Sequence, residues 1–234
     1  MKILITSGGT SEKIDRVRSI TNHSTGSLGK TIAQVFLQKG DQVTLVTTKR
    51  AIKPEPHPQL TIYEIESVAA LAACLEPLVK NHEVLIHAMA VSDYTPVYMT
   101  ELAELEKTED LESLLDKRNQ ESKISSKADY QVLFLKKTPK IISMIKKWNP
   151  TIRLIGFKLL VDVSKEELIA VARSSLLKNQ ADMIVANDLL NISADRHLAY
   201  LVEPVGYKQA ETRADIAQQL YEKIHGEDLW KTSP

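Results

Sequence analysis

Two glycine-rich segments near the start of the chain have the composition of an anion-binding site. The first, residues 6–10 (Thr-Ser-Gly-Gly-Thr), directly follows an apolar run, and the second, residues 22–29 (Asn-His-Ser-Thr-Gly-Ser-Leu-Gly), opens a helical pattern over residues 30–39. Backbone N–H groups at a helix N-terminus have no intrahelical partner and so favour phosphate, and glycine lets a ligand approach the backbone closely. We therefore expect a nucleotide or a phosphate ester here. Glycine pairs in ordinary sheet-edge turns are the simpler alternative.

The main alternative function is nicotinamide-dependent redox chemistry, because glycines after the first strand of a doubly wound sheet are typical of it. The sequence has neither Gly-x-Gly-x-x-Gly nor a Walker loop, and no tyrosine is followed four residues later by lysine. The second expected strand ends at residues 46–50 (Val-Thr-Thr-Lys-Arg) with no acid for a ribose hydroxyl, although Arg50 suits a 2′-phosphate. An NADP-dependent, short-chain-type oxidoreductase is thus the second hypothesis, and a nucleotide-binding regulator is a third.

Metal and thiol catalysis are not favoured by the sequence. The histidines form no His-Glu-x-x-His motif and no close pair, so we interpret all of them as structural or incidental and expect no dedicated metal site. The single cysteine, Cys74, lies in an apolar, helix-favouring segment, which indicates a buried small hydrophobic residue rather than a nucleophile. The histidines are His23, His57, His82, His87, His197 and His225.

The charges of the whole chain cancel, with 30 Lys and Arg residues against 30 Asp and Glu residues among 234. A neutral chain has no global positive field to attract nucleic acid or an anionic membrane surface, so any anion site must be local. The start of the chain has no signal-peptide pattern, and the sequence contains no unbroken run of 18 apolar residues. We expect a cytoplasmic protein without nucleic-acid or membrane partners, in which residues 1–234 form one domain around one main core.

Short apolar runs that alternate with helical patterns predict the elements that hold the glycine-rich segments. Such alternation indicates a parallel sheet with crossover helices, and hence an α/β fold of the doubly wound, Rossmann-like, three-layer αβα type with a mostly parallel sheet. The predicted strands are residues 2–6, 42–47, 61–65, 83–88, 130–135, 153–157, 182–186 and 198–202, the last one antiparallel at an edge.

Three helices have sequence signals at their N-termini. Pro139 suits the first position of a helix, because its missing N–H would have no partner there in any case. Ser164 and Glu167 have the spacing of a capping box. Thr212 opens a last helix, which we expect to end near Gly226.

One charged stretch interrupts this alternation. Residues 98–122 carry eight acids and three bases with five scattered leucines, which is typical of a solvated amphipathic helical excursion. Their position immediately before Lys123 raises the alternative of a flap that closes over a bound ligand. We expect a small dimerisation or flap element within the main domain.

Five short segments carry the remaining recognisable motifs. They are residues 7–10 (Ser-Gly-Gly-Thr) continued by 20–29, 90–94 (Ala-Val-Ser-Asp-Tyr), 123–126 (Lys-Ile-Ser-Ser), 156–159 (Gly-Phe-Lys-Leu) with Asp162, and 185–188 (Val-Ala-Asn-Asp). In this order they resemble the motifs of phosphopantothenate–cysteine ligases, also called phosphopantothenoylcysteine synthetases, of the monofunctional bacterial type. Residues 125–126 replace two lysines found in many members, and residues 158–160 (Lys-Leu-Leu) replace Ala-Ala-Glu of bacterial two-domain members. These departures leave the choice between CTP and ATP open.

The resemblance implies an enzyme of coenzyme A synthesis that forms an amide bond. In this family the carboxylate of 4′-phosphopantothenate attacks the α-phosphate of CTP or ATP, which releases pyrophosphate and leaves an acyl-nucleotide. The amine of L-cysteine then attacks this anhydride and releases the nucleoside monophosphate. Mg²⁺ is expected to bridge the triphosphate through phosphate oxygens and water. The resemblance further implies a homodimer with composite active sites, no flavin, and a separate decarboxylase for the next step.

The same resemblance implies roles for single residues. Asn22 and Lys123 are the implied catalytic residues, because the Asn22 amide can donate to the reacting carboxyl group and Lys123 can neutralise charge at the transferred phosphate. A turn asparagine and a solvated surface lysine are the ordinary alternatives. Arg18 is implied to bind the substrate phosphate from the neighbouring subunit, with a surface ion pair as its alternative. The implied nucleotide-binding residues are Gly8, Gly9, Ser24, Gly26, Gly29, Lys123, Phe157, Asn187 and Arg213, and the implied substrate-binding residues are Arg18, Asn22, Ala90 and Asp93.

Overall fold

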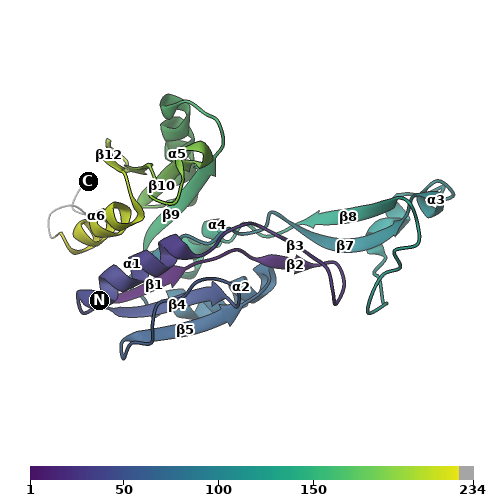
Figure 1. The fold of residues 1–234 in the computed structure, drawn as a ribbon, viewed down its shortest axis with the longest axis horizontal. Helices are drawn as coiled ribbons and strands as arrows, with labels where there is room; N and C mark the ends of the chain where they lie inside the picture. Colours follow the sequence, from purple (N-terminus) through teal and green to yellow (C-terminus); the bar gives the residue numbers. More distant parts are fainter. Residues whose placement is uncertain (227–234) are drawn as a thin grey trace.

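The computed structural model describes residues 1–226, which form a body built on an eight-stranded sheet and a thin arm of two further strands (Figure 1). Six neighbouring strands, from β10 to β5, run parallel, and β11 and β12 are antiparallel at one edge. In spatial order the strands are β12 (Tyr207–Ala210), β11 (Ala199–Val202), β10 (Met183–Asp188), β9 (Arg153–Leu160), β6 (Val84–His87), β1 (Lys2–Thr6), β4 (Gln42–Thr48) and β5 (Leu60–Ile65).

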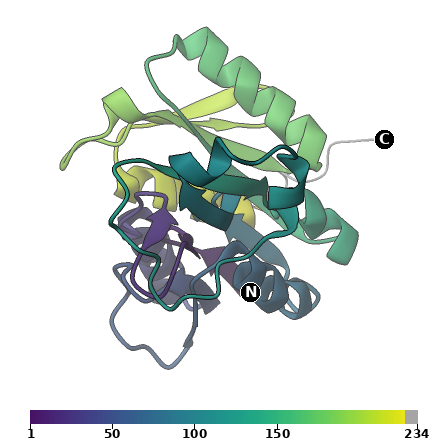
Figure 2. The same cartoon turned by 90° about the vertical axis from the view of Figure 1, so that its right-hand side faces the viewer.

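Helices cover both faces of this sheet, as Figure 2 shows from the end of the arm. Apolar side chains of α2, α4 and α5 pack with Leu4 on one face, and those of α1 and α6 pack with Ile3 and Ile5 on the other. Successive side chains of a strand point to opposite faces, so the central strands are apolar throughout. The doubly wound αβα fold is confirmed. The helices are α1 (Ser27–Gln38), α2 (Val68–Val79), α4 (Ile142–Trp148), α5 (Lys165–Asn179) and α6 (Arg213–His225). None of the helices within residues 1–226 is long and apolar enough to cross a membrane.

The chain leaves β1 and β6 toward opposite sides of the sheet. From β1 it crosses through α1 to β4 and then β5, whereas from β6 it passes through the arm to β9 and β10. A crevice therefore opens at the carboxyl ends of β1 and β6, and ligands of open α/β sheets bind at such a switch point. Thr6 and His87, the last residues of these two strands, are paired in register at this place.

The arm consists of β7 (Tyr94–Glu101) paired antiparallel with β8 (Gln131–Lys137), with α3 (Leu102–Leu105) and the 3₁₀ helix η1 (Glu112–Asp116) between them. The prediction that residues 130–135 belong to the main sheet is therefore wrong, since this apolar run pairs with β7. The interpretation of residues 98–122 as a helical excursion is only partly right, because the segment begins inside β7 and contains two short helical pieces. Tyr98 and Leu114 are buried outside the two main clusters, so the arm has a small apolar core of its own.

Three short strands have no counterpart among the predictions. The hairpin of β2 (Ser11–Lys13) and β3 (Ser19–Thr21) packs at the root of the arm, where β2 contacts β7. Strand β12 is mostly exposed and polar, and it adds to the edge of the sheet beside β11. Polar strands of three or four residues give no hydrophobic period, and so local sequence does not reveal them.

The capping signals at two helices are confirmed. The Ser164 hydroxyl accepts a hydrogen bond from the N–H of Glu167 (3.1 Å) at the start of α5. The Thr212 hydroxyl accepts one from the N–H of Asp215 (3.1 Å) at the start of α6. Each bond satisfies an N–H group that has no helical acceptor.

The prediction for Pro139 is wrong, because α4 begins only at Ile142. Thr138, which precedes Pro139, is hydrogen-bonded to the segment after β6. Its hydroxyl donates to the carbonyl of Ser92 (2.6 Å), and its N–H donates to the carbonyl of Asp93 (2.9 Å). These bonds hold the chain in a non-helical course beside the end of β6.

Cys74 is partly buried in α2 and packs against the core. Burial raises the pKa of its thiol. A raised pKa lowers the fraction of reactive thiolate, which agrees with a packing role.

Candidate functional site

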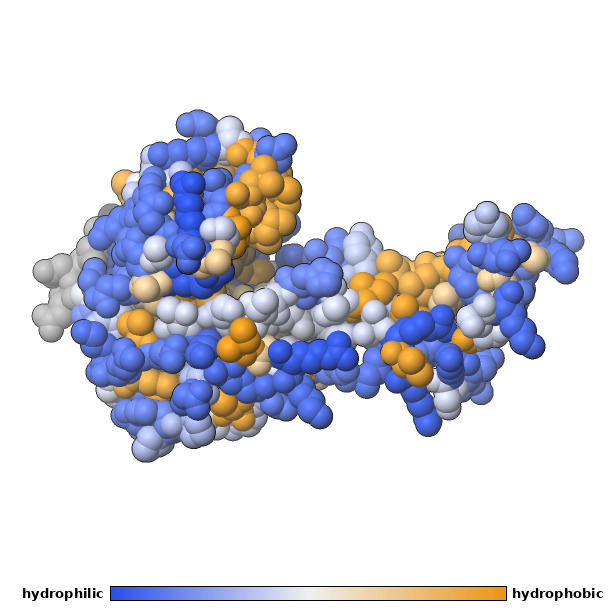
Figure 3. All heavy atoms as spheres, in the orientation of Figure 1, coloured by the Kyte–Doolittle hydropathy of each residue, from blue (hydrophilic) through white to orange (hydrophobic). Residues whose placement is uncertain are grey.

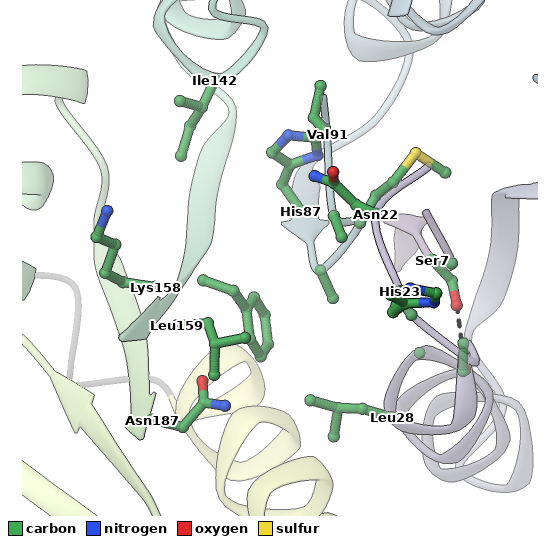
Figure 4. Close-up of a pocket in the computed structure, with 18 of the residues that line it drawn as sticks. Ser7, Asn22, His23, Leu28, His87, Val91, Ile142, Lys158, Leu159 and Asn187 are labelled. Atoms are coloured by element: carbon green, nitrogen blue, oxygen red, sulfur yellow. Dashed lines mark hydrogen bonds between the residues drawn. The ribbon is translucent and has the colours of Figure 1, made fainter. Parts of the chain in front are cut away.

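A cavity of about 610 Å³ opens at the switch point. Figure 4 shows one wall formed by the glycine-rich loops and α1, and a facing wall formed by β9, β10 and the start of α4. The fold thus brings together most of the residues singled out from the sequence. Those that line the cavity are Gly8, Asn22, Ser24, Gly26, Gly29, Ala90, Asp93, Phe157, Asn187 and Arg213.

Close backbone packing brings the two glycine-rich loops to the N-terminus of α1. Gly8 and Gly26 have positive φ angles of 82° and 79°, which glycine adopts without strain. The Ser7 hydroxyl donates to the carbonyl of Gly26 (3.1 Å). Gly29 lies so close to Ser7 that a β-carbon on it would be 2.5 Å from Ser7 Cβ. Helix α1 therefore begins directly behind the first loop, and its first-turn N–H groups, which have no helical acceptor, lie beside the cavity.

The Asn22 side chain projects into the cavity from the loop between β3 and α1 (Figure 4). Its main chain is fixed from behind, because its N–H donates to the carbonyl of Thr10 (3.4 Å) and Gly9 packs against its carbonyl oxygen. A β-carbon on Gly9 would collide with that oxygen, so Gly9 supports the site without lining it. The Asn22 amide has no hydrogen-bond partner within residues 1–226, which leaves its donor to a ligand.

Residues 90–93 reach the cavity because they continue the sheet pattern beyond β6. The N–H of Ala90 donates to the carbonyl of Gly8 (2.9 Å), and the N–H of Thr10 donates to the carbonyl of Ala90 (3.0 Å). The Thr10 hydroxyl accepts from the N–H of Ser92 (2.9 Å) and donates to its hydroxyl (2.9 Å). The first glycine-rich loop and the segment after β6 are therefore one hydrogen-bonded unit.

The cavity is locally cationic although the chain as a whole is neutral. Lys140, Lys158 and Arg213 line it, and Asp93 is the one acidic residue among the described residues of its lining. Asp93 is paired with Lys140 at the rim (Oδ1 to Nζ, 2.9 Å). No carboxylate of the lining remains for Lys158 and Arg213, so the crevice favours an anionic ligand.

The far end of the cavity combines an aromatic ring with two buried polar side chains. Phe157 lines it, and the buried side chains of Asn187 and His197 lie 3.5 Å apart (Nδ2 to Nε2). Arg213 donates to the carbonyls of the turn at residues 193–194 (3.2 and 3.1 Å). Burial, with the charge of Arg213 as a second cause, lowers the pKa of His197 to about 4, so its ring is neutral at pH 7.

Asp188 ties together the loops that follow β9 and β10. Its buried carboxylate accepts hydrogen bonds from the N–H groups of Val163 (2.9 Å), Leu190 (2.8 Å) and Asp162 (3.2 Å). These bonds lower the pKa of Asp188. Asp162 has a positive φ of 55°, a conformation that a non-glycine residue adopts only with support. The Asp188 carboxylate at the end of one motif therefore holds the main chain at Asp162 and Val163, beyond the other motif.

Arg18 and Lys123 lie outside the cavity, where the turn between β2 and β3 contacts residues 122–124 of the arm. The Arg18 guanidinium pairs with Asp15 (2.7 Å), holds the pKa of that carboxyl well below its usual range, and donates to the carbonyl of Ile124 (3.0 Å). Lys123, next to Ile124, is exposed and lines a separate concavity on the arm. The structure thus places Arg18 and Lys123 in two neighbouring segments, and it does not bring them to Asn22.

Lys140 and His87 are among the polar residues of the cavity that sequence reasoning missed. Lys140 directly follows the proline that the sequence assigns to a helix start, and its rim position depends on the non-helical course of that segment. His87 ends an apolar run, which indicates a core residue. Its place at the carboxyl end of a parallel strand is the signal that could have identified it, because ligands bind at such ends.

The fold and the cavity define a doubly wound α/β protein with a cationic, glycine-lined site at its switch point. Comparison with known proteins gives the family. The chain belongs to the family described as the DNA/pantothenate metabolism flavoprotein C-terminal domain, whose model matches residues 1–115 and 115–227. This confirms the family relationship indicated by the five motifs.

Several relatives resemble the chain over most of its length. Coenzyme A biosynthesis bifunctional protein CoaBC of Thermococcus kodakarensis is 31% identical over 234 residues, which cover 95% of this chain and 50% of that protein. A crystal structure of the DNA/pantothenate metabolism flavoprotein from Streptococcus pneumoniae is 59% identical, with a TM-score of 0.92 over 96% of this chain and 98% of the other. The C-terminal domain of a CoaBC protein is 26% identical, with a TM-score of 0.70 over 95% and 93% of the two chains.

The chain spans about half the length of the curated relatives that it matches. Its similarity to the C-terminal domain of CoaBC covers almost all of that domain. These relatives give no support to the oxidoreductase hypothesis.

Acid should destabilise the folded protein through His87. Burial, with repulsion from Lys140 as a second cause, lowers the pKa of this residue from 6.5 to about 4. Below pH 6.5 the unfolded chain therefore binds a proton that the folded chain binds only near pH 4, so stability is full above pH 6.5 and falls as the pH drops toward 4. At about 1.4 kcal/mol per pKa unit, the loss at pH 5 is about 2 kcal/mol from this residue.

Urea unfolding at pH 7 and at pH 5 checks this expectation. The free energy of unfolding of His87→Gln should fall by about 2 kcal/mol less between the two pH values than that of the parent. An equal fall in both proteins would show that His87 is not the source.

Proposed function

We propose that this chain is a phosphopantothenate–cysteine ligase of coenzyme A biosynthesis. It activates the carboxylate of 4′-phosphopantothenate with CTP or ATP as an acyl-nucleotide. It then condenses this intermediate with L-cysteine to give 4′-phosphopantothenoylcysteine, the nucleoside monophosphate and pyrophosphate. The observation that carries the proposal is the convergence of Asn22 and two glycine-rich loops on one cationic cavity, in a chain related to a coenzyme A biosynthesis protein.

The cavity suits a reaction in which positioning and charge neutralisation supply the catalysis. A carboxylate acylates an amine only after activation, because its oxygen is a poor leaving group. Attack on the α-phosphate provides that activation without a protein nucleophile. The glycine-rich loops and the start of α1 offer N–H groups to the phosphates, and Lys158 and Arg213 offer positive charge. Phe157 and Asn187 at the far end would hold the base.

Magnesium would neutralise the triphosphate. Residues 1–226 contain no group of three or more His, Cys, Asp or Glu side chains able to hold a metal ion. Mg²⁺ accompanies nucleotides in many sites through phosphate oxygens and water, and we propose the same binding mode here. We therefore assign no direct protein ligand.

The 4′-phosphopantothenate substrate would lie along residues 90–93. The Asp93 carboxylate and the main-chain groups near Ala90 can bind the hydroxyl and amide groups of pantothenate. Asn22 opens the second glycine-rich loop and lines the same cavity as residues 90–93. Its neutral amide could bind first the carboxylate and then the acyl carbonyl without trapping either by full charge. The Asp93–Lys140 pair lies at the outer end of this path.

A homodimer would complete the site. The arm is a two-stranded ribbon, which is marginal alone in water, and it exposes large apolar side chains (Figure 3). A second copy packed on the arm would cover them and would place Arg18 and Lys123 toward the partner's cavity. The exposed apolar residues of the arm are Tyr94, Leu102, Leu111, Leu115, Tyr130 and Leu135. We assign no flavin-dependent step to this cavity and assign the next decarboxylation to a separate protein.

Pyrophosphate release tests the proposed function. The purified protein is incubated with 4′-phosphopantothenate, L-cysteine and Mg²⁺, in parallel with CTP and with ATP. We expect pyrophosphate that depends on 4′-phosphopantothenate, together with the amide product, and the faster nucleotide identifies the preferred one. A folded protein that releases none with either nucleotide is not this ligase.

Asn22→Asp should abolish most of the amide formation, because a second carboxylate repels the substrate carboxylate. We expect a loss of about 100-fold or more in kcat, with nucleotide affinity changed less than about threefold. The exposed Asn81→Asp in the turn after α2 is the matched control and should behave as the parent. Product assays and nucleotide titration by calorimetry measure the two effects, and unchanged turnover would remove Asn22 from the mechanism.

Mixing two inactive variants tests the composite site. If Arg18 acts in the partner's cavity, Arg18→Ala and Asn22→Asp each inactivate a different half of one site. Randomly mixed dimers would then regain about a quarter of the parent activity, since half are mixed and each mixed dimer has one intact site. Activity that stays at the level of the separate variants would place both residues in the same subunit's site.

A further inference from the structure

His87 is a buried ionisable residue that the proposed chemistry does not yet use. It is the last residue of β6, it is 7% exposed, and it lines the cavity. Strand β6 lies between β1 and β9, so the imidazole is located at the centre of the switch point.

Thr6 fixes the position of the ring hydrogen on His87. Thr6 Oγ1 lies 2.7 Å from His87 Nδ1 and accepts a hydrogen bond from the N–H of Met89 (3.2 Å). Thr6 is fully buried, and its hydroxyl hydrogen has no other acceptor within residues 1–226. The hydroxyl therefore donates to Nδ1. A neutral imidazole that accepts at Nδ1 carries its hydrogen on Nε2.

Because His87 lines the cavity and Thr6 engages Nδ1, Nε2–H is the ring donor that remains for a ligand. Among the described residues no side chain or carbonyl accepts from it. In Figure 4 the ring of His87 and the amide of Asn22 are both drawn at the wall of the cavity that both residues line. Main-chain contacts fix the position of Asn22 relative to the segment after β6, because Gly9 pairs with Ala90 and packs against the Asn22 carbonyl.

The surroundings of the ring disfavour a positive charge. Lys140 repels the protonated form, and the pKa of His87 falls to about 4 through burial and this repulsion. The other charged groups of the cavity are Lys158 and Arg213, which are cationic, and Asp93, which is paired with Lys140. His87 is thus a neutral donor at pH 7, and its only free nitrogen lone pair is occupied by Thr6, so it cannot act as a base toward a ligand.

We propose that His87 donates from Nε2–H to the acyl carbonyl oxygen of the reacting intermediate, and that with the Asn22 amide it forms a two-donor oxyanion hole. This rests on the proposed function. When the cysteine amine attacks the acyl-nucleotide, the C–N bond forms and the carbonyl oxygen takes the electron pair of its π bond. Collapse breaks the C–O bond to the phosphate, whose oxygen leaves with that bond's electron pair, and the amine proton passes to the phosphate or to water. Two neutral donors stabilise the transient oxyanion without pairing permanently with the starting carboxylate.

The test separates the two half-reactions. Exchange of labelled pyrophosphate into the nucleotide, dependent on 4′-phosphopantothenate, measures acyl-nucleotide formation without cysteine. Amide formation measures the complete reaction. We expect His87→Leu to reduce amide formation by about 100-fold, the usual effect of removing one oxyanion donor, and to reduce exchange by less than about fivefold. His87→Gln, whose amide nitrogen can replace Nε2, should recover most of the loss.

Two further measurements exclude a merely structural role. Nitrogen-15 NMR of the histidine rings should show the Nε2–H tautomer in the parent, with a shift of this resonance on addition of 4′-phosphopantothenoylcysteine. In Thr6→Val the tautomer preference should weaken and amide formation should fall without an equal fall in exchange. His57→Leu, in an exposed loop, is the control and should match the parent.

The outcomes are distinct. A parent chain that makes no pyrophosphate and no amide overturns the proposed function, and the role of His87 with it. An active parent with His87→Leu within about threefold of it overturns the donor role alone. Equal losses in His87→Leu and His87→Gln, spread equally over both half-reactions, would also overturn it by showing that the ring serves packing.

Discussion

The opposite departure of the chain from β1 and β6 is the constraint on which the site depends. The connections that follow two such neighbouring parallel strands lead to opposite sides of the sheet. They therefore leave a crevice between them at the carboxyl ends of the strands. Both glycine-rich loops, residues 90–93 and the buried Thr6–His87 pair belong to this one place. The location of the cavity therefore follows from topology before any side chain is considered.

Main-chain contacts do most of the positioning within that crevice. Gly9 and Gly29 are required because neighbouring atoms leave no room for a β-carbon. Thr10 joins the first loop to the segment after β6, and Asp188 gathers the N–H groups of two loops on the opposite wall. A few charged side chains then make the cavity lining net positive. Because the nucleotide would be held largely by the backbone, its base preference is not encoded in any obvious residue type.

Sequence reasoning succeeded where the signal is local. The buried strands of the main sheet, the caps at Ser164 and Thr212, and the glycine-rich loops each have a pattern within a few residues. It failed where the partner is distant. Residues 130–135 have the composition of a core strand, yet their partner is β7, and nothing within the segment distinguishes the two.

The candidate site shows the same division. Most of the motif residues line one cavity, because the motifs fall at strand ends and at the start of a helix, and their roles there stay predictions. Arg18 and Lys123 lie outside the cavity beside the arm, and only the proposed second copy would bring them to a cavity, which a single sequence cannot place. His87 was overlooked for the opposite reason: its apolar neighbours are typical of a core, and only the register of β1 with β6 shows that its ring ends at the cavity.

The arm has a further consequence for how the chain folds. Strands β6 and β9 are neighbours in the sheet, yet residues 88–152 intervene between them. Closing so long a connection has an entropic cost, but that cost grows only by about 0.6 kcal/mol for each doubling of its length. The stability of the sheet therefore depends only weakly on the length of the β7–β8 arm. The length of the arm can therefore be determined by what the arm binds. The stability of the body hardly depends on that length.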